Sequence, residues 1–468
     1  METKFENILT DFETFTKTLP KLNEPRLFSF ASQLNKSDWL SIINKIIASF
    51  SDVSFFKTAN NQLAIIGINS ALNLQSSDSS NFTNISESFN HWKNKFANNW
   101  NELNKTTAPI IFCSARFDMN NSSKLWEEFD PLRIRVPEFI LEFNSNVAYV
   151  HYNFILKKNS EVKVYSTKLS KFLKKLFEPM NGSEDSSPKL NSIKFDDKES
   201  FSDWTDVFNK VEKILEDGDL NKLVLSRTFN FKIENQINWK TILSKLHERF
   251  PECYLFIIKK NNSIFFGSSP EMFLKVAKNT AVVESVAGSA ARGEKTEADH
   301  ELEKFLKTSA KNHQEHLIVS NFITDVLIKY SDNVQVLEKK QIRKLDNIQH
   351  LITRISAELN LEDDLFKLID SLFPTPAVCG VPKEKAMDLI RKLEVHDRGL
   401  YSGLVGFFDF ENNCELAVAI RSALVKENHV TAFAGAGLVK GSDPKEEFLE
   451  INLKLSTILS LFNDENKS

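Results

Sequence analysis

Two carboxylates and a lysine near the C-terminus share one face of a predicted helix. Glu447, Glu450 and Lys454 are spaced i, i+3 and i+7. Asp443 is predicted as the N-cap of this helix and Pro444 as its first residue. In a chain with only 13 glycines, three stand close by: Gly435, Gly437 and Gly441. Accessible backbone beside carboxylates and an ammonium suits an anionic ligand held together with a hard cation. A solvated helix face with i, i+4 ion pairs explains the same spacing.

Other short motifs point away from several common classes of enzyme. The histidines of HQEH (His313–His316) are spaced i, i+3, whereas a zinc protease helix carries them at i, i+4. Gly435-Ala436-Gly437 is not a GxGxxG fingerprint, and it follows a predicted strand near the chain end. The segment VPKEKA lacks the GxxxxGK[ST] pattern of a P-loop. Zinc, dinucleotide and P-loop chemistry are therefore disfavoured.

The composition indicates a globular protein that does not bind nucleic acid. The net charge is −4 and the isoelectric point about 6.2, whereas phosphate contacts need a basic face. The N-terminal segment METKFENILTDFETF is unlike a secretory signal, and no apolar run approaches ~18 residues, so we expect no membrane span. The cysteines form no CxxC pair, which favours reduced thiols and a cytoplasmic location. They are Cys113, Cys253, Cys379 and Cys414.

The N-terminal part is predicted to be rich in strands. A hairpin spans Phe55–Ile68 with its turn at Asn60-Asn61, and a helix is predicted over Glu87–Asn101. The polar segment Met180–Ser192 is predicted as a surface loop between two helices. Further strands are predicted at Pro109–Phe117, Val136–Phe143 and Val147–Leu156.

The C-terminal half holds most of the glycines, and this directs attention to it as the seat of the chemistry. Ten of the 13 lie at or after Gly267. One long helix is predicted over Thr296–Ser331, and its polar middle, Thr308–His316, lines a cavity or forms a solvated bend. A single strand is predicted over Glu415–Val425. A strand from Asn221, a hairpin around Asn261-Asn262 and strands at Tyr401–Phe408 and Val430–Ala434 complete the pattern.

Several sequence blocks occur in one order over Ser202–Phe462: KLVLSR at Lys222, FGSSPEMFL at Phe266, VAGSAARG at Val286, HQEH at His313, PTPAVCGVPK at Pro374, RGLYSG at Arg398, AVAIRSALV at Ala417 and AFAGAG…EEFLEINLK at Ala432. This series resembles the chorismate-utilising enzymes, which include isochorismate, salicylate, anthranilate and aminodeoxychorismate synthases. The resemblance implies an α/β (α+β) fold with two stacked antiparallel β-sheets flanked by helices and an active-site cleft at one end. Residues 1–200 are then the N-terminal strand-rich part of the same large domain, 201–462 the catalytic region and 463–468 a disordered tail.

The resemblance also implies Mg²⁺ as cofactor, bound with the ring carboxylate of chorismate. By position, Glu315 and Glu450 match the metal ligands, and Glu447 and Asn312 match partners that act through water. Mg²⁺ prefers oxygen ligands and is commonly held by one or two carboxylates plus an anionic substrate. Backbone N–H groups near Gly435 and Gly437, with the ammonium of Lys454, are expected at the same carboxylate.

Further residues match positions that contact the rest of the substrate. Arg421 matches the arginine for the enolpyruvyl carboxylate, where a planar guanidinium suits a carboxylate. Tyr401 is expected beside it, and His350 near the substrate ring. Gly288 and Ser289 match a turn that approaches the substrate.

The choice among the family's reactions depends on residues upstream of the C-terminal helix. Lys222 matches the base of the members that use water, and Glu271 matches the general acid that protonates the leaving 4-hydroxyl. Ala377 stands where isochorismate synthases have alanine and the other members generally have threonine. We therefore expect an isomerase, isochorismate synthase, that adds water at C2 of chorismate.

Rival functions stay open on the sequence alone. They are salicylate synthase and a catalytically silent homologue, and the pathway is menaquinone or siderophore biosynthesis. A monomer without a glutaminase subunit is expected.

Overall fold

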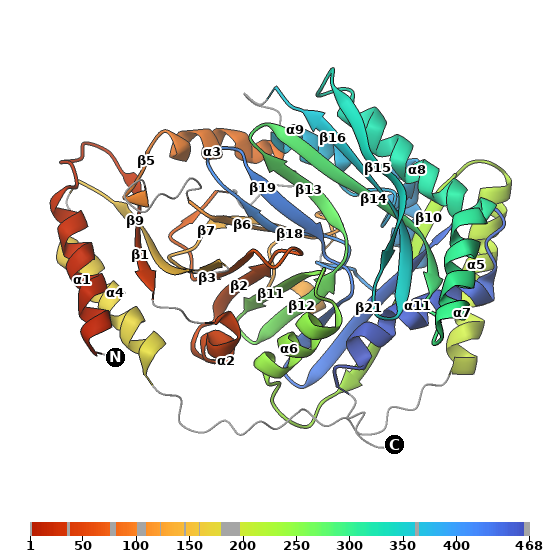
Figure 1. Cartoon of the computed structure of the whole chain (residues 1–468), viewed down its shortest axis with the longest axis horizontal. Helices are drawn as coiled ribbons and strands as arrows, with labels where there is room; N and C mark the ends of the chain where they lie inside the picture. Colours follow the sequence, from red (N-terminus) through yellow and green to blue (C-terminus); the bar gives the residue numbers. More distant parts are fainter. Residues whose placement is uncertain are drawn as a thin grey trace.

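Two β-sheets organise the computed structural model (Figure 1). The structure describes residues 2–34, 38–74, 81–100, 109–121, 123–144, 147–158, 160–178, 197–360 and 365–462. The predicted loop Met180–Ser192 and the predicted tail 463–468 lie outside these ranges.

Within the described residues, the larger sheet has 12 strands and the smaller has nine. In spatial order the larger contains β17 (Gly380–Val381), β10 (Lys222–Lys232), β21 (His429–Leu438), β20 (Ser422–Lys426), β12 (Ser263–Ser269), β11 (Tyr254–Lys260), β2 (Asp52–Lys57), β3 (Leu63–Ile68), β8 (Phe139–Asn144), β9 (Ala148–Leu156), β1 (Arg26–Leu34) and β5 (Phe96–Asn98). The smaller contains β15 (Val334–Lys344), β16 (Ile348–Glu358), β14 (Thr280–Ala291), β13 (Met272–Ala277), β19 (Cys414–Val418), β18 (Leu404–Phe408), β6 (Ile111–Ala115), β7 (Leu132–Val136) and β4 (Leu72–Asn73).

Helices flank the sheets: α1 (Glu2–Lys17), α2 (Trp39–Ser49), α3 (Ser86–Lys93), α4 (Val162–Phe177), α5 (Asp197–Glu216), α6 (Trp239–Arg249), α7 (Thr296–Thr308), α8 (Ala310–Leu327), α9 (Leu365–Leu372), α10 (Lys383–Leu393) and α11 (Pro444–Leu459). Helices α1 and α4 pack together at one end of the molecule, while α5, α7, α8 and α11 gather at the other (Figure 1). Within the described ranges, none of the helices combines the length and the apolar character needed to cross a lipid bilayer.

The ladders confirm the predicted pair of antiparallel sheets. Among the described strands, β1 pairs parallel with β5 and the other ladders are antiparallel. Strands from the first 200 residues join both sheets, with β6 next to β18 and β2 next to β11. An apolar cluster contains side chains from both sheets, including Phe56 and Phe265 from the larger and Phe112 and Val405 from the smaller. Burial of each such apolar side chain contributes roughly 1.5–3 kcal/mol, so this cluster holds the sheets together.

Both predicted hairpins are confirmed. Strands β2 and β3 are joined through Asn61, which adopts a φ of 58°, and β11 and β12 are joined through Asn261 with a φ of 49°. Asparagine tolerates this left-handed conformation better than most residues. The predicted cap of the last helix is confirmed as well, since the Asp443 side chain accepts hydrogen bonds from the backbone N–H groups of Lys445 and Glu446.

Two helix predictions were wrong in their extent. The helix predicted over Glu87–Asn101 ends at Lys93, and the chain then forms β5 because Phe96 pairs with Leu27 of β1. The single helix predicted over Thr296–Ser331 is two helices that meet at Ser309. The Ser309 backbone is extended, with φ −64° and ψ 117°, and its side chain caps α8 by accepting from the Asn312 N–H at 3.3 Å. A serine that satisfies free N–H groups starts a new helix at little cost.

The strand predicted over Glu415–Val425 is also divided, and this division shapes the site. Strand β19 belongs to the smaller sheet and β20 to the larger, so the chain crosses between sheets at 419–421. Arg421, at the end of the crossing, adopts a φ of 51°. A second crossing, Pro270-Glu271, leads from β12 to β13. Because β12 pairs with β20 and β13 with β19, the two crossings lie side by side.

Candidate active site

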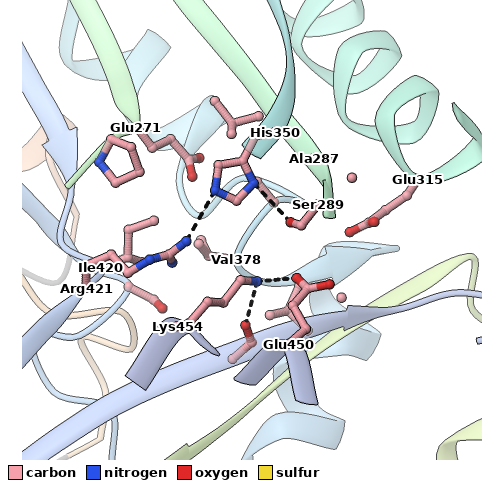
Figure 2. Close-up of a pocket in the computed structure, with 18 of the residues that line it drawn as sticks. Glu271, Ala287, Ser289, Glu315, His350, Val378, Ile420, Arg421, Glu450 and Lys454 are labelled. Atoms are coloured by element: carbon pink, nitrogen blue, oxygen red, sulfur yellow. Dashed lines mark hydrogen bonds and ion pairs between the residues drawn. The ribbon is translucent and has the colours of Figure 1, made fainter. Parts of the chain in front are cut away.

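A cavity with an empty volume of about 580 Å³ lies at the two crossings. Its wall contains twelve of the residues predicted for the site: Glu271, Gly288, Ser289, Glu315, His350, Ala377, Tyr401, Arg421, Gly435, Gly437, Glu450 and Lys454. In Figure 2, Glu271 and Glu315 point toward the cavity from different sides, and His350 lies between them. Segments far apart in the sequence therefore supply one site.

Lys222 and Glu447 stand just behind this wall. The Lys222 side chain is 1% exposed, and its Nζ lies 2.9 Å from Oε1 of Glu315. Strands β10 and β21 pair so that Val224 faces Gly437. A Cβ at Gly437 would collide with the Glu315 carboxylate and lie 2.9 Å from Cε of Lys222. The missing side chain at Gly437 is what lets this ion pair reach the cavity.

Glu271 is a buried carboxyl with the properties of an acid. It is 4% exposed, and its own N–H donates to Ser269 Oγ at 3.2 Å. Burial raises its pKa to about 7, although the charge of Lys222 acts in the opposite direction. A carboxyl with this pKa is partly protonated at neutral pH and can donate a proton to a leaving oxygen.

Ser289, His350 and Arg421 form a hydrogen-bonded chain across one wall (Figure 2). The Arg421 guanidinium lies 3.2 Å from His350 Nε2, and His350 Nδ1 lies 3.0 Å from Ser289 Oγ. Because a guanidinium only donates, Nε2 must accept and Nδ1–H must donate to the serine. Burial, with the charge of Arg421, lowers the pKa of His350 well below its usual value. The imidazole is therefore neutral, and the Ser289 hydroxyl proton is left for another acceptor.

Helix α11 adds an ion pair on the opposite wall. Lys454 Nζ lies 2.5 Å from Oε1 of Glu450 and donates to the Gly435 carbonyl at 2.9 Å (Figure 2). Burial alone would raise the pKa of Glu450, but Lys454 outweighs it and lowers that pKa to about 2. The adjacent Glu447, 1% exposed, is ion-paired with Lys311 of α8. Burial and the charge of Glu450 raise the pKa of Glu447 to about 7.

The donor set fits a magnesium ion only together with other oxygen ligands. Across the described residues, no group of three or more His, Cys, Asp or Glu side chains is placed to hold a metal by itself. Glu315 and Glu450 nevertheless line the same cavity. Two carboxylates complemented by substrate oxygens and water are the usual environment of Mg²⁺ in enzymes.

Asn312 and His316 help to place α8 against β14. Asn312 is 6% exposed. A Cβ added at Gly288 would lie only 3.2 Å from the Cβ of Asn312, so the two segments pack closely because residue 288 is glycine. Gly288 itself adopts a φ of +82° in a bulge of β14. His316 lies 3.2 Å from the Ala287 carbonyl and 2.8 Å from Thr353 Oγ1, and burial lowers its pKa to about 4. His316 thus joins α8 to β14 and β16.

Several residues of the site were not identified from the sequence. Lys311 pairs with Glu447, and its position four residues before Glu315 on one helix face was the available signal. The apolar part of the wall comes from Val224, Pro270, Val286, Ala287, Val378 and Ile420, and Ser402 adds a hydroxyl. Most of these are direct neighbours of predicted residues, but strand and loop apolar residues carry no chemical signature of their own.

Comparison with known families gives the class of protein. Residues 13–463 match the family model described as chorismate binding enzyme. The chain therefore belongs to the chorismate-binding enzymes.

Particular relatives narrow the similarity within this family. The chain is 26% identical over 454 residues to isochorismate synthase MenF of Bacillus subtilis, covering 96% of each chain. It is 37% identical over 248 residues to a chloroplastic isochorismate synthase of Catharanthus roseus, covering 53% of this chain and 43% of that one. Among solved structures, Escherichia coli MenF superimposes with a TM-score of 0.76 at 22% identity, covering 97% of this chain and 99% of that chain. This likeness shows the fold.

Proposed function

We propose that the protein is a Mg²⁺-dependent isochorismate synthase, an isomerase that converts chorismate to isochorismate. The observation that carries the proposal is a buried acid on one side of the cavity and a buried lysine behind the other. Glu271 has a pKa raised to about 7 by burial, and Lys222 reaches the cavity through its contact with Glu315. Relatives matched over 96% and over 53% of this chain are named isochorismate synthase.

The proposed reaction exchanges one hydroxyl for another. Lys222 acts from its neutral form, in which it takes a proton from a water molecule whose oxygen bonds to C2 of chorismate; its protonated form is the one that pairs with Glu315. The ring double bonds shift, the bond between C4 and its hydroxyl oxygen breaks, and Glu271 gives that oxygen a proton so that it leaves as water. One water enters and one leaves, so the product is an isomer of the substrate.

The charges around the cavity support a role for a metal. Lys222, Lys311 and Lys454 are each ion-paired with a glutamate. Among the described residues that line the cavity, Arg421 is the cation whose partner is a neutral imidazole rather than a carboxylate. Arg421 can thus bind one carboxylate of chorismate, the enolpyruvyl one.

The ring carboxylate needs additional positive charge, and Mg²⁺ supplies it when held by Glu315 and Glu450. Lys454 and the backbone near Gly435 and Gly437 orient the same carboxylate, while Tyr401 lines the wall beside Arg421. Glu447 would act through water on a metal held there.

The product of purified protein tests this proposal. Incubation with chorismate and Mg²⁺, followed by HPLC, is expected to give isochorismate as the main early product. Salicylate with an equivalent of pyruvate would instead establish a salicylate synthase. Unchanged chorismate after long incubation would establish a silent homologue.

Menaquinone biosynthesis is the pathway we favour. Isochorismate synthase MenF of Bacillus subtilis is matched over 96% of this chain, whereas an enzyme named for salicylate biosynthesis, from Pseudomonas aeruginosa, is matched over 52% of it. Siderophore biosynthesis is the alternative, and the genes next to this one distinguish the two. A cytoplasmic monomer that acts without a glutaminase subunit completes the proposal.

A further inference from the structure

The backbone on both sides of Glu271 is held by a single pair of charged side chains. The Arg343 guanidinium donates to the Pro270 carbonyl, which belongs to the peptide group before Glu271. The Met272 N–H, in the peptide group after Glu271, donates to Glu284 Oε2 at 3.3 Å. Both peptide groups that flank the Glu271 Cα therefore have a side-chain partner.

The two partners are bound to each other with good geometry. Arg343 Nη1 lies 2.8 Å from Glu284 Oε2 and Nη2 lies 2.7 Å from Oε1, a two-pronged ion pair. Glu284 is 5% exposed and stands on β14, and Arg343 stands on β15. Arg354 of β16 donates to Glu284 Oε1 at 2.9 Å from the outer side. The pair thus joins the crossing at Glu271 to strands of the smaller sheet.

When both flanking peptide groups are held in place, the direction in which the Glu271 side chain leaves its Cα is also set. The crossing consists of Pro270 and Glu271 alone, and its ends are set by two different sheets. A shift of either peptide group would turn the Glu271 carboxyl away from the cavity. Such misplacement of a proton donor by about 1 Å can cost about 100-fold in rate.

The pair also acts on Glu271 through charge. Burial is the main cause of the raised pKa of Glu271, and the negative charge of Glu284 adds to it. The cations that face Glu271 oppose this effect: Lys222 of β10, Arg421 at the second crossing and Lys454 of α11. Glu284 thus adds to the effect of burial and opposes the lowering of the Glu271 pKa by these three cations.

We propose that Glu284 and Arg343 are positioning residues for the general acid Glu271, holding its backbone from both sides. This inference rests on the proposed function, since it takes Glu271 to be the acid of the reaction. Neither residue lines the cavity wall. They act on catalysis through Glu271 and not through contact with chorismate.

Steady-state kinetics with chorismate across pH 6–9 tests the inference. In Arg343→Lys the charge is kept, but a point ammonium cannot bind Glu284 with two prongs and the Pro270 carbonyl together. We expect kcat to fall by about 10- to 100-fold with KM within about twofold. In Glu284→Gln the loss of activity at high pH, where Glu271 deprotonates, is expected to begin about half a pH unit lower or more. Arg354→Ala is the matched control, since Arg354 binds the same Glu284 but not the crossing.

A readout without substrate separates this inference from the proposed function. In protein labelled with ¹³C at glutamate side chains, the Glu271 signal is assigned by its absence from Glu271→Gln, and its titration is followed by NMR. Its pKa is expected to fall in Glu284→Gln and not in Arg354→Ala. An unchanged titration, or equal effects of Arg354→Ala and Glu284→Gln, would overturn the inference. If wild-type protein fails to convert chorismate, the proposed function fails, and the NMR titration still decides whether Glu284 controls Glu271.

Discussion

Replacing Glu271 by glutamine is expected to stabilise the protein above neutral pH while it removes the general acid. The folded protein favours the neutral carboxyl, because burial raises the Glu271 pKa from an ordinary 4.5 to about 7. The direction in which stability changes with pH follows from the difference between the folded and unfolded pKa values. With the folded pKa above the unfolded one, the contribution of Glu271 to stability is fully present below pH 4.5 and is lost as pH rises toward 7.

The size of the effect follows from the same shift. A difference of about 2.5 units at about 1.36 kcal/mol per unit costs the wild-type protein about 3 kcal/mol at pH 8. Glutamine keeps the shape and carries no charge, so Glu271→Gln avoids this cost. With an unfolding entropy of about 2.1 cal/mol/K per residue over the 468 residues, about 3 kcal/mol corresponds to a rise in Tm of about 3 °C.

Thermal melts at two pH values make the test. We expect Glu271→Gln to melt about 3 °C above wild type at pH 8 and about 1 °C above it at pH 5, with turnover of chorismate reduced by about 10²- to 10⁴-fold. Glu301→Gln, at an exposed position on α7, is the control and is expected to change Tm equally little at both pH values. A difference in Tm that does not depend on pH, or a lower Tm for Glu271→Gln at pH 8, would refute the reasoning.

Four further outcomes are expected. Lys222→Ala abolishes turnover and leaves the circular dichroism spectrum unchanged; wild-type rates would contradict its role as base. Gly437→Ala, whose Cβ would collide with Glu315, weakens chorismate binding measured by calorimetry by about tenfold or more. Arg421→Lys raises KM and lowers kcat together in steady-state assays. EDTA abolishes turnover and Mg²⁺ restores it, and chorismate tightens Mg²⁺ binding by calorimetry in wild type but not in Glu450→Gln.

Much of the site could be predicted because most of its residues lie in short sequence motifs that resemble those of a known family. The two-sheet fold is what the family resemblance implies, whereas both asparagine hairpins and the capped last helix follow from turn residues and an Asp-Pro start. These motifs predicted that Glu271, Arg421 and Glu450 belong to one site. In the structure the three residues line one cavity although they lie far apart in the sequence. Residue types with charge or conformational freedom leave a local signal, and that signal was sufficient here.

What the sequence did not reveal depends on partners distant in the chain. The run AVAIRSALV has uniform strand propensity, so nothing local shows that β19 ends in one sheet and β20 begins in the other. Ser309 is polar in a polar stretch, and its role as a helix cap is set by how α7 and α8 pack. The ion pair of Lys311 with Glu447 joins α8 to α11, and only the fold brings these side chains together.

The substrate anchor and the acid are coupled through the backbone of the two crossings. The Ser268 N–H donates to the Arg421 carbonyl at 3.1 Å, and the Val418 N–H donates to the Glu271 carbonyl at 3.1 Å. The backbone of Arg421 is therefore hydrogen-bonded to β12, the strand that precedes Glu271. The backbone of Glu271 is hydrogen-bonded to β19, the strand that precedes Arg421. A change that moves Arg421 also moves the proton donor. The enolpyruvyl carboxylate that Arg421 is proposed to bind is remote from the reacting bonds. Substitution of Arg421 is nevertheless expected to change kcat as well as KM, because its binding energy also aligns the proton donor with the substrate.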